Sequence, residues 1–288
     1  MVGQERFQDI NKILNARLAE KKVLIAVHRG SWGGSIIENT IPAYMAALQQ
    51  GADMFECDLI KSVDGQLYAI HDTYERRLLK KMKNIKTMSS SQIRKLQYYN
   101  CIGEPTGQRV QRFEEVLEHF TNGELFNIDR AWSILAEVDE VMRKYPHAIH
   151  QAVIKTPVKD EFLEFFQNCP VKYMYMPICY SMDEVRKALS YTDINMVGVE
   201  AIARSKDSDL FDPENIQWMK DQGLYVWSNT ITLSNYDRHI LCAGYDDNKA
   251  IMEGPDAAWG VLIDQGYNVL QTDWPAQMSK FRDQKLGV

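Results

Sequence analysis

Two histidines and two carboxylates lie close together near the start of the sequence, each beside a short apolar run. His28 follows VLIAV, His71 follows LYAI, and Glu56 and Asp58 lie on a third run between them. Because alternate side chains of a strand share a face, Glu56 and Asp58 are expected to point the same way. Two such carboxylates repel each other unless a cation lies between them or they share a proton. Together with Arg29, these residues predict a metal-assisted acid–base site for a phosphate ester.

The carboxylates also indicate the kind of cation. Glu56 and Asp58 offer oxygen ligands, and neither cysteines nor clustered histidines accompany them. A hard divalent cation, Mg²⁺ or Ca²⁺, is therefore expected rather than Zn²⁺, with Mn²⁺ as a further candidate. A third ligand is needed, and Asp129 fits because it ends another apolar run. The alternative is a pair of strand-end carboxylates held by backbone amides or by an arginine.

Candidate substrate ligands follow the same strand-end logic. Arg29 is expected to bind phosphate, because guanidinium forms paired hydrogen bonds to phosphate oxygens. Lys155 ends a later apolar run and is a second candidate, although an ordinary surface lysine is an equal alternative. Trp227 and Asn229 end the seventh run and are expected to line a pocket, with core packing the alternative for Trp227. Glu200 ends the sixth and is a candidate for a substrate hydroxyl.

The elements that must position these residues alternate along the whole chain. Buried strands are predicted at residues 23–27, 53–60, 125–129, 149–155, 172–176, 196–200, 224–228 and 268–272. Helical patterns separate them, and an apolar stripe over residues 4–20 predicts a helix that covers the bottom of the fold. Eight strands alternating with helices predict an α/β protein with a (β/α)₈ TIM barrel, in one domain over residues 1–288. Catalytic groups of such barrels lie at the C-terminal ends of the strands, where these candidates fall.

Six short motifs in this stretch carry a family resemblance. They are His28-Arg29-Gly30, Glu38-Asn39-Thr40, Gly51-Ala52-Asp53, Glu56-x-Asp58, Asp64-Gly65 and His71-Asp72. Their order and spacing resemble the N-terminal signature of the glycerophosphodiester phosphodiesterases, in the phosphatidylinositol phosphodiesterase-like barrel superfamily. Weaker similarity continues in four later segments, residues 112–117, 125–129, 225–229 and 270–275. The resemblance covers roughly residues 23 to 283.

The resemblance implies a function and a set of roles. It implies metal-dependent hydrolysis of glycerophosphodiesters to glycerol 3-phosphate and an alcohol. His28 and His71 would be the general acid and general base, in an order that the sequence leaves open. Residues 74–110 would be a small insertion over the barrel mouth. This segment is basic, so it could attract anionic substrates, and a solvated face is the alternative.

The sequence departs from the family pattern in the third core strand. The family usually has Glu where Asp129 stands, followed two residues later by Lys, where this chain has Ala131. The missing lysine removes an expected phosphate contact. Arg130 should point to the other face of the strand, and Lys155 could supply the charge instead. These changes leave a lysophospholipase D-like or other phosphodiesterase on the same barrel, and a catalytically silent binding module, as alternatives. An apolar groove beside the mouth would favour lysophospholipids.

Composition limits the setting. The 288 residues carry a net charge of −6, which argues against a nucleic-acid surface. Five cysteines without a CxxC pair do not suggest a disulfide framework. The first residues lack the apolar core of a signal peptide, and no run approaches the roughly 18 apolar residues of a membrane span. We therefore expect a cytoplasmic protein, unless a leader precedes this sequence, with a small-molecule substrate and no stable membrane anchor.

Overall fold

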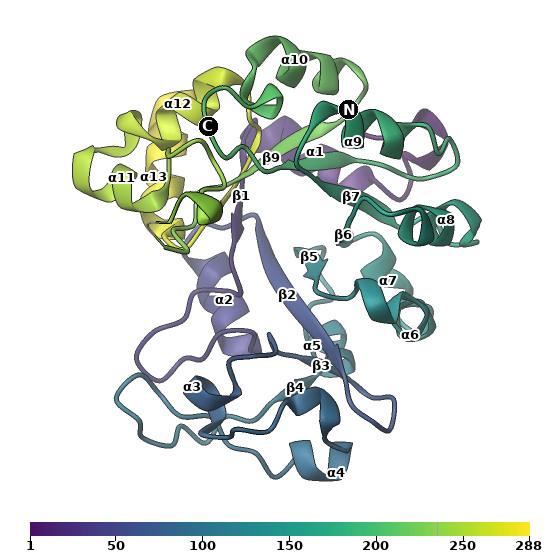
Figure 1. Cartoon of the computed structure of the whole chain (residues 1–288), viewed down its shortest axis with the longest axis vertical. Coiled ribbons are helices and arrows are strands. Elements are labelled where there is room, and N and C mark those ends of the chain that lie inside the picture. Colours follow the sequence, from purple (N-terminus) through teal and green to yellow (C-terminus); the bar gives the residue numbers. More distant parts are fainter. Residues whose placement is uncertain (235) are drawn as a thin grey trace.

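The computed structural model describes residues 1–234 and 236–288 and forms a closed barrel of eight parallel strands (Figure 1). The strands run in the order β1-β10-β9-β8-β7-β6-β5-β2, and β2 pairs with β1 to close the ring. Their bounds are β1 (Leu24–Val27), β2 (Met54–Lys61), β5 (Leu125–Asp129), β6 (Ala152–Pro157), β7 (Met174–Cys179), β8 (Gly198–Ala201), β9 (Tyr225–Asn229) and β10 (Val269–Thr272). The predicted TIM barrel is confirmed.

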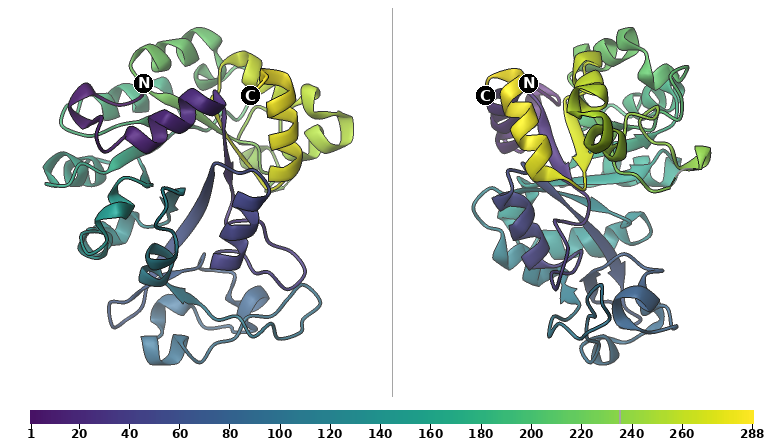
Figure 2. Two further views of the ribbon diagram at one scale, coloured as in Figure 1. Left: turned by 180° about the vertical axis from the view of Figure 1, so that it is seen from behind. Right: turned by 90° about the vertical axis from the view of Figure 1, so that its left-hand side faces the viewer.

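Helices lie outside the strands (Figures 1 and 2). They are α2 (Ile41–Gln49), α5 (Phe113–His119), α6 (Leu135–Met142), α7 (Pro146–Ile149), α8 (Asp160–Asn168), α9 (Met182–Leu189), α10 (Pro213–Asp221), α11 (Asp247–Glu253), α12 (Trp259–Gln265) and α13 (Pro275–Leu286). Short 3-10 helices lie in the connections: η1 (Glu5–Phe7), η2 (Ile85–Thr87), η3 (Trp132–Ile134), η4 (Asp209–Phe211), η5 (Asp237–His239) and η6 (Pro255–Ala257).

Two apolar layers hold the barrel together. The outer layer packs strands against helices, and in it the ring of Phe55 stacks between those of Tyr44 and Phe126. The inner layer fills the barrel, and α1 (Lys12–Lys21) closes its N-terminal end through Leu14 and Leu18. This is the arrangement that the N-terminal apolar stripe predicted. Because the barrel interior is packed with side chains, polar groups gather where the strands end.

The segment between β2 and α5 builds a second packing centre. It contains β3 (Leu67–Ala69), α3 (Glu75–Leu79), α4 (Ser90–Ile93) and β4 (Gln111–Arg112). The end of β2 pairs antiparallel with β3, so residues 59–69 form a hairpin. Side chains such as Ile60, Tyr68 and Leu78 form an apolar cluster separate from the barrel layers. In Figure 1 this part lies below the barrel. The bounds of an insertion at 74–110 stay a prediction.

The polar connection over residues 234–255 is partly helical. Within it, Asp246 caps α11 by accepting a hydrogen bond from the backbone N–H of Lys249. Residue 235 of this connection lies outside the described residues. Among the helices described here, none is both long and apolar enough to cross a bilayer.

Candidate active site

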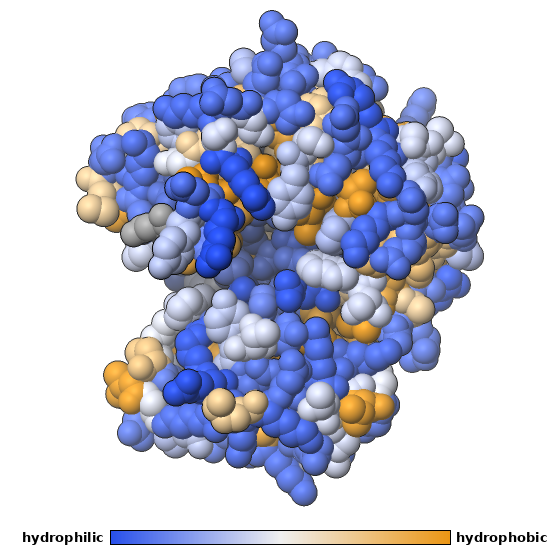
Figure 3. All heavy atoms as spheres, in the orientation of Figure 1, coloured by the Kyte–Doolittle hydropathy of each residue, from blue (hydrophilic) through white to orange (hydrophobic). Residues whose placement is uncertain are grey.

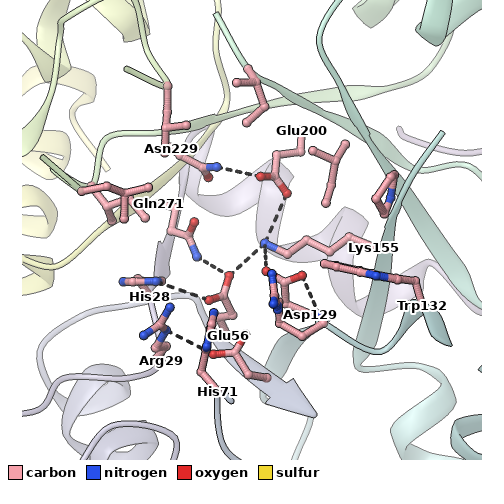
Figure 4. Close-up of a pocket in the computed structure, with 18 of the residues that line it drawn as sticks. His28, Arg29, Glu56, His71, Asp129, Trp132, Lys155, Glu200, Asn229 and Gln271 are labelled. Atoms are coloured by element: carbon pink, nitrogen blue, oxygen red, sulfur yellow. Dashed lines mark hydrogen bonds and ion pairs between the residues drawn. The ribbon is translucent and has the colours of Figure 1, made fainter. Parts of the chain in front are cut away.

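A polar cavity of about 390 Å³ opens at the C-terminal ends of the barrel strands (Figure 4). Nine of the ten predicted site residues line it: His28, Arg29, Glu56, Asp58, His71, Asp129, Lys155, Glu200 and Asn229. Because the C-terminal ends of parallel strands meet at one end of a barrel, residues far apart in the sequence converge there. The tenth, Trp227, is not part of the lining.

Three carboxylates, two of them buried and the third half-buried, form a group that fits a divalent cation. Glu56, Asp58 and Asp129 each offer an oxygen, and these atoms lie within 4.8 Å of one another. The register of β2 and β5 causes this, because it pairs Asp58 directly with Asp129. Burial and the nearby charge of Glu56 raise the pKa of Asp58 to about 7. A hard cation bound by these oxygens would remove the repulsion, and the all-oxygen donor set suits Mg²⁺ or Ca²⁺.

Lys155 lies at the centre of the acidic group. Its Nζ is 2.9 Å from Glu56 Oε2, 3.0 Å from Asp129 Oδ2 and 3.2 Å from Glu200 Oε2 (Figure 4). Burial alone lowers the pKa of this amine, but the three carboxylates raise it well above its usual value, so the lysine stays charged. The alternative of an ordinary surface lysine is therefore wrong, because the side chain is only 2% exposed.

The charges of this group do not cancel. Lys155 pairs with three of the four carboxylates, and Arg29 pairs with the fourth through its Nε, 3.1 Å from Asp58 Oδ2. Four carboxylates thus share two basic side chains as their ion-pair partners. A divalent cation held by the carboxylate oxygens would add positive charge to a group in which acidic side chains outnumber basic ones.

His28 follows β1 and contacts two acidic residues. Its Nδ1 is 3.2 Å from Asp273 Oδ1, and its Nε2 is 3.9 Å from Glu56 Oε1. Burial lowers the pKa of His28, but the hydrogen bond to Asp273 and the charge of Glu56 outweigh it, so the pKa is raised overall. His28 is therefore held toward its protonated form.

His71 has a different partner. Its Nδ1 lies 2.5 Å from the backbone oxygen of Asp72, which can only accept, so Nδ1 must carry the proton and Nε2 is left as an acceptor. Asp72 thus orients the ring through its backbone oxygen and not through its carboxylate. That carboxylate pairs with Lys86 at 2.8 Å and with Arg130 at 3.5 Å. Burial and the charge of Arg29 lower the pKa of His71, which favours the neutral ring.

The turn after β1 fixes Arg29. Arg29 adopts φ +59°, and its Nη1 donates to Glu38 Oε1 at 3.1 Å. Asn39, at φ +55°, donates to Asp58 Oδ2 at 2.8 Å and accepts from the Asp58 N–H at 3.0 Å. The residue after Arg29 must be glycine, because a Cβ on Gly30 would lie 2.6 Å from the Ala43 carbonyl carbon of α2. Arg29 and Asn39, which both have strained positive φ angles, thus hold the Asp58 carboxylate in place.

Two predictions at the site are wrong. Arg130 was expected on the far face of β5, but the strand ends at Asp129 and Arg130 turns to φ +61°, which directs its side chain into the cavity lining. Ala131 is fully buried in the outer apolar layer. Trp227 was expected to contact substrate, yet it is buried within the barrel, where Lys155 Nζ lies 5.6 Å from its ring. Its Nε1 donates to Asn229 Oδ1 at 2.5 Å.

Sequence reasoning also missed two residues that hold the site in place. Asp273 contacts His28, and Gln271 donates from Nε2 to Glu56 Oε2 at 2.6 Å. Both follow or end β10, within the segment 270–275 that carries part of the family resemblance. Their strand-end position was the available signal. Asn229, which was expected to line the pocket, does so and donates to Glu200 Oε1 at 2.7 Å.

Comparisons with known proteins agree with this geometry. A family model for a domain of unknown function, DUF4996, matches residues 175–281. A glycerophosphodiester phosphodiesterase of Caldanaerobacter subterraneus subsp. tengcongensis is 35% identical over 239 residues, which are 78% of this chain and 92% of that protein. One from Bacillus subtilis is 24% identical over 245 residues, 78% of this chain and 81% of that protein.

Solved structures share the barrel. A glycerophosphoryl diester phosphodiesterase from Parabacteroides distasonis superposes with a TM-score of 0.73 at 16% identity, covering 92% of this chain and 87% of that one. An Oleispira antarctica phosphodiesterase in complex with the product sn-glycerol-3-phosphate has a TM-score of 0.64 at 16% identity, covering 92% and 99%. The similarity to these two structures supports the fold. The sequence identity and coverage of the Caldanaerobacter relative show family membership. The chain belongs to the glycerophosphodiester phosphodiesterase family, as its motifs predicted.

Proposed function

We propose that this protein hydrolyses glycerophosphodiesters to glycerol 3-phosphate and an alcohol, with one divalent cation and two histidines. The observation that carries the proposal is the grouping of His28, His71 and the three carboxylates in one cavity of a chain from this family. The product complex of the Oleispira antarctica enzyme supports glycerol 3-phosphate as a product of this barrel.

Glu56, Asp58 and Asp129 would hold the cation. A bound divalent cation polarises a phosphoryl oxygen and lowers the pKa of a coordinated hydroxyl. Arg29 and Lys155 supply further positive charge beside the phosphate, where negative charge builds as the phosphorus is attacked. Lys155 thereby takes the place of the lysine that Ala131 replaces, from β6 instead of β5.

The partners of the two histidines assign their roles. His71 presents an unprotonated Nε2, so it accepts a proton from the water that attacks phosphorus. His28 is paired with a carboxylate, so it is held protonated and donates from Nε2 to the departing alkoxide. Glu200 and Asn229, which are hydrogen-bonded to each other, are left to orient a substrate hydroxyl beside Lys155.

Replacing the histidines tests this proposal. His28→Ala and His71→Ala should each lower kcat for glycerophosphocholine about 10²–10⁴-fold, the usual weight of general acid–base catalysis. The measurement is release of glycerol 3-phosphate at saturating cation. His150→Ala is the matched control, because His150 lies outside the cavity lining and its ring nitrogen is hydrogen-bonded to the backbone oxygen of Asp9. Undiminished turnover in both histidine variants would rule the mechanism out.

A further inference from the structure

A second cavity, of about 510 Å³, adjoins the catalytic one and shares His28 and Arg29 with it. Figure 3 shows the molecule hollowed between the part that contains α3 and the part that contains α11. We call this cavity the apolar groove. Its walls include the apolar and aromatic side chains Trp32, Ile36, Ile37, Tyr74, Leu78 and Tyr99, and the charged Arg29, Glu38, Arg77 and Asp273 also line it. Its volume is within the range of about 300–1,000 Å³ that small-molecule sites occupy.

The groove is built between the barrel and the segment below it. Trp32 and Ile36 come from the loop after β1, which is closed by paired backbone hydrogen bonds between Gly33 and Ile36. Tyr74, Leu78 and Tyr99 come from the segment around α3. Water reaches these walls: Trp32 is 48% exposed and Ile36 37% exposed. An apolar surface that leads to a catalytic histidine is the form of a binding site for an apolar part of the substrate.

The aromatic faces of the groove are already covered by side-chain cations. Quaternary ammonium groups bind over such faces, but the Arg29 guanidinium lies 4.8 Å from the Tyr74 ring, and Arg77 lies 4.7 Å from Tyr74 and 5.6 Å from Trp32. Lys80 Nζ lies 4.4 Å from the Tyr99 ring. The two carboxylates of the lining are also paired, Glu38 with Arg29 and Arg77, and Asp273 with His28. A choline head group over these rings would meet positive charge, whereas an aliphatic chain would pack against the apolar side chains of the walls.

We infer that the apolar groove holds the acyl chain of a lysophospholipid whose phosphodiester lies in the catalytic cavity, an inference that rests on the proposed function. In the reaction, one water molecule adds across the bond between phosphorus and the head-group oxygen. The oxygen of water becomes bonded to phosphorus, and the head-group alcohol leaves with a proton. The products are a monoacylglycerol phosphate and the free alcohol. The groove thus selects glycerophosphodiesters that carry one chain.

The dependence of kcat/KM on chain length tests the inference. We compare glycerophosphocholine with its hexanoyl, octanoyl and decanoyl lysophosphatidylcholine counterparts, below their micelle concentrations and at saturating cation. Each added methylene group that enters the groove should raise kcat/KM by up to about fourfold, the value of burying one methylene. Values that stay flat or fall with chain length overturn the inference.

A matched pair of isoleucine variants locates the effect. Ile36→Ser should lower the ratio of kcat/KM for the decanoyl substrate to that for glycerophosphocholine about tenfold, because a polar group enters the groove wall. Ile251→Ser on α11 is the control, because Ile251 has a similar exposure of 46% and does not line the groove. An unchanged ratio in Ile36→Ser, or an equal fall in both variants, contradicts the inference.

Binding of decyl phosphate, measured by calorimetry, needs no turnover. It therefore tests the acyl-chain site in the groove separately from the proposed hydrolysis. Tight binding that Ile36→Ser weakens, with no diester hydrolysed, would retain the groove and reject the proposed function. Hydrolysis of glycerophosphocholine, with decyl phosphate bound no more tightly than glycerol 3-phosphate, would retain the function and reject the groove.

Discussion

Lys155 is the residue on which the electrostatics of the site depend. Its ammonium group is the shared partner of Glu56 and Glu200, which are buried, and of Asp129, whose side chain is 17% exposed. Removing one partner of a buried ion pair leaves an uncompensated charge and costs about 3–5 kcal/mol. The lysine therefore stabilises the folded protein as well as contributing charge to the site.

Lys155→Met should lower the free energy of unfolding by about 3–5 kcal/mol in EDTA. A saturating divalent cation should restore more stability to the variant than to the parent protein, because the freed carboxylates would then have a cation to bind; at a hundred times Kd the gain is about 2.7 kcal/mol. Urea unfolding with and without cation measures both effects. Lys159→Met is the control, since that side chain is 60% exposed. A loss no larger than that of Lys159→Met would contradict this account.

The two histidines should produce a bell-shaped pH profile. A general base must be neutral and a general acid protonated. Activity should therefore fall on the acid side as His71, whose pKa is lowered by burial and Arg29, becomes protonated. It should fall on the alkaline side as His28, whose pKa Asp273 and Glu56 raise against burial, loses its proton. The maximum of kcat/KM should lie around the ordinary histidine pKa of about 6.5.

Asp273→Asn isolates one limb of that profile. Without the carboxylate the pKa of His28 falls, so the alkaline limb should move to lower pH while the acid limb stays in place. Asp183→Asn, at a side chain that is 93% exposed, should leave both limbs unchanged. An alkaline limb that does not move, or that moves to higher pH, would show that His28 is not the acid.

At the level of elements, α11 supports the strand ends that carry the site. Its buried Asp247 accepts hydrogen bonds from Thr230 Oγ1 at 2.6 Å, Thr272 Oγ1 at 2.9 Å and Trp259 Nε1 at 2.9 Å. It also accepts from the backbone N–H of Asp273 at 2.9 Å, directly before the turn into α13. One carboxylate thus ties the ends of β9 and β10 to α11 and holds the partner of His28.

Asp247→Ala should therefore affect both stability and catalysis. We expect the free energy of unfolding to fall by roughly 3–5 kcal/mol, because several buried donors lose their acceptor at about 1–3 kcal/mol each. In the folded fraction kcat should fall with KM nearly unchanged, since Asp273 no longer orients His28. Asp246→Ala, which removes only the cap of α11, should cost about 1 kcal/mol. Equal losses in the two variants would contradict the proposed role of Asp247.

Much of the barrel was predictable because buried parallel strands leave a plain record in the sequence. The predicted run at residues 125–129 coincides with β5, since its ends are marked by a change from apolar to polar residues. The sequence pattern does not indicate how deep in the barrel each residue lies. Tyr225, Trp227 and Asn229 alternate onto one face of β9, but Trp227 lies one layer deeper than Asn229 and so cannot reach the cavity.

Local backbone conformation explains the other error. Alternation of faces predicts where a side chain points only while the strand continues. At Arg130 the backbone has already left β5 with a positive φ, and its side chain turns toward Asp72 and lies over the ring of Trp132. A positive φ at a non-glycine residue has no sequence signal in a single chain. The candidate carboxylates and histidines could be predicted, and their supporting contacts could not.

At the level of the whole molecule, the segment after β2 supplies one wall of the apolar groove. Its apolar cluster around Tyr68 and Leu78 holds α3 beside the barrel mouth, where Arg77 pairs with Glu38 at 2.7 Å. Glu38 in turn pairs with Arg29, so the segment is coupled to the arginine that we propose as a phosphate ligand. For the basic segment 74–110, the sequence left two alternatives, a solvated face or a surface that attracts anionic substrates. The ion pair of Arg77 shows that part of its charge has a structural role instead.

The most direct test of the central claim is hydrolysis of glycerophosphocholine by the EDTA-treated, dialysed protein, before and after addition of Mg²⁺, Ca²⁺ or Mn²⁺. If the carboxylates act through a bound cation, almost no glycerol 3-phosphate should be released without metal. Activity should recover with at least one of the three ions. Recovery should be absent in His28→Ala and His71→Ala. Full activity in EDTA, or no activity with any of these cations, would contradict the account.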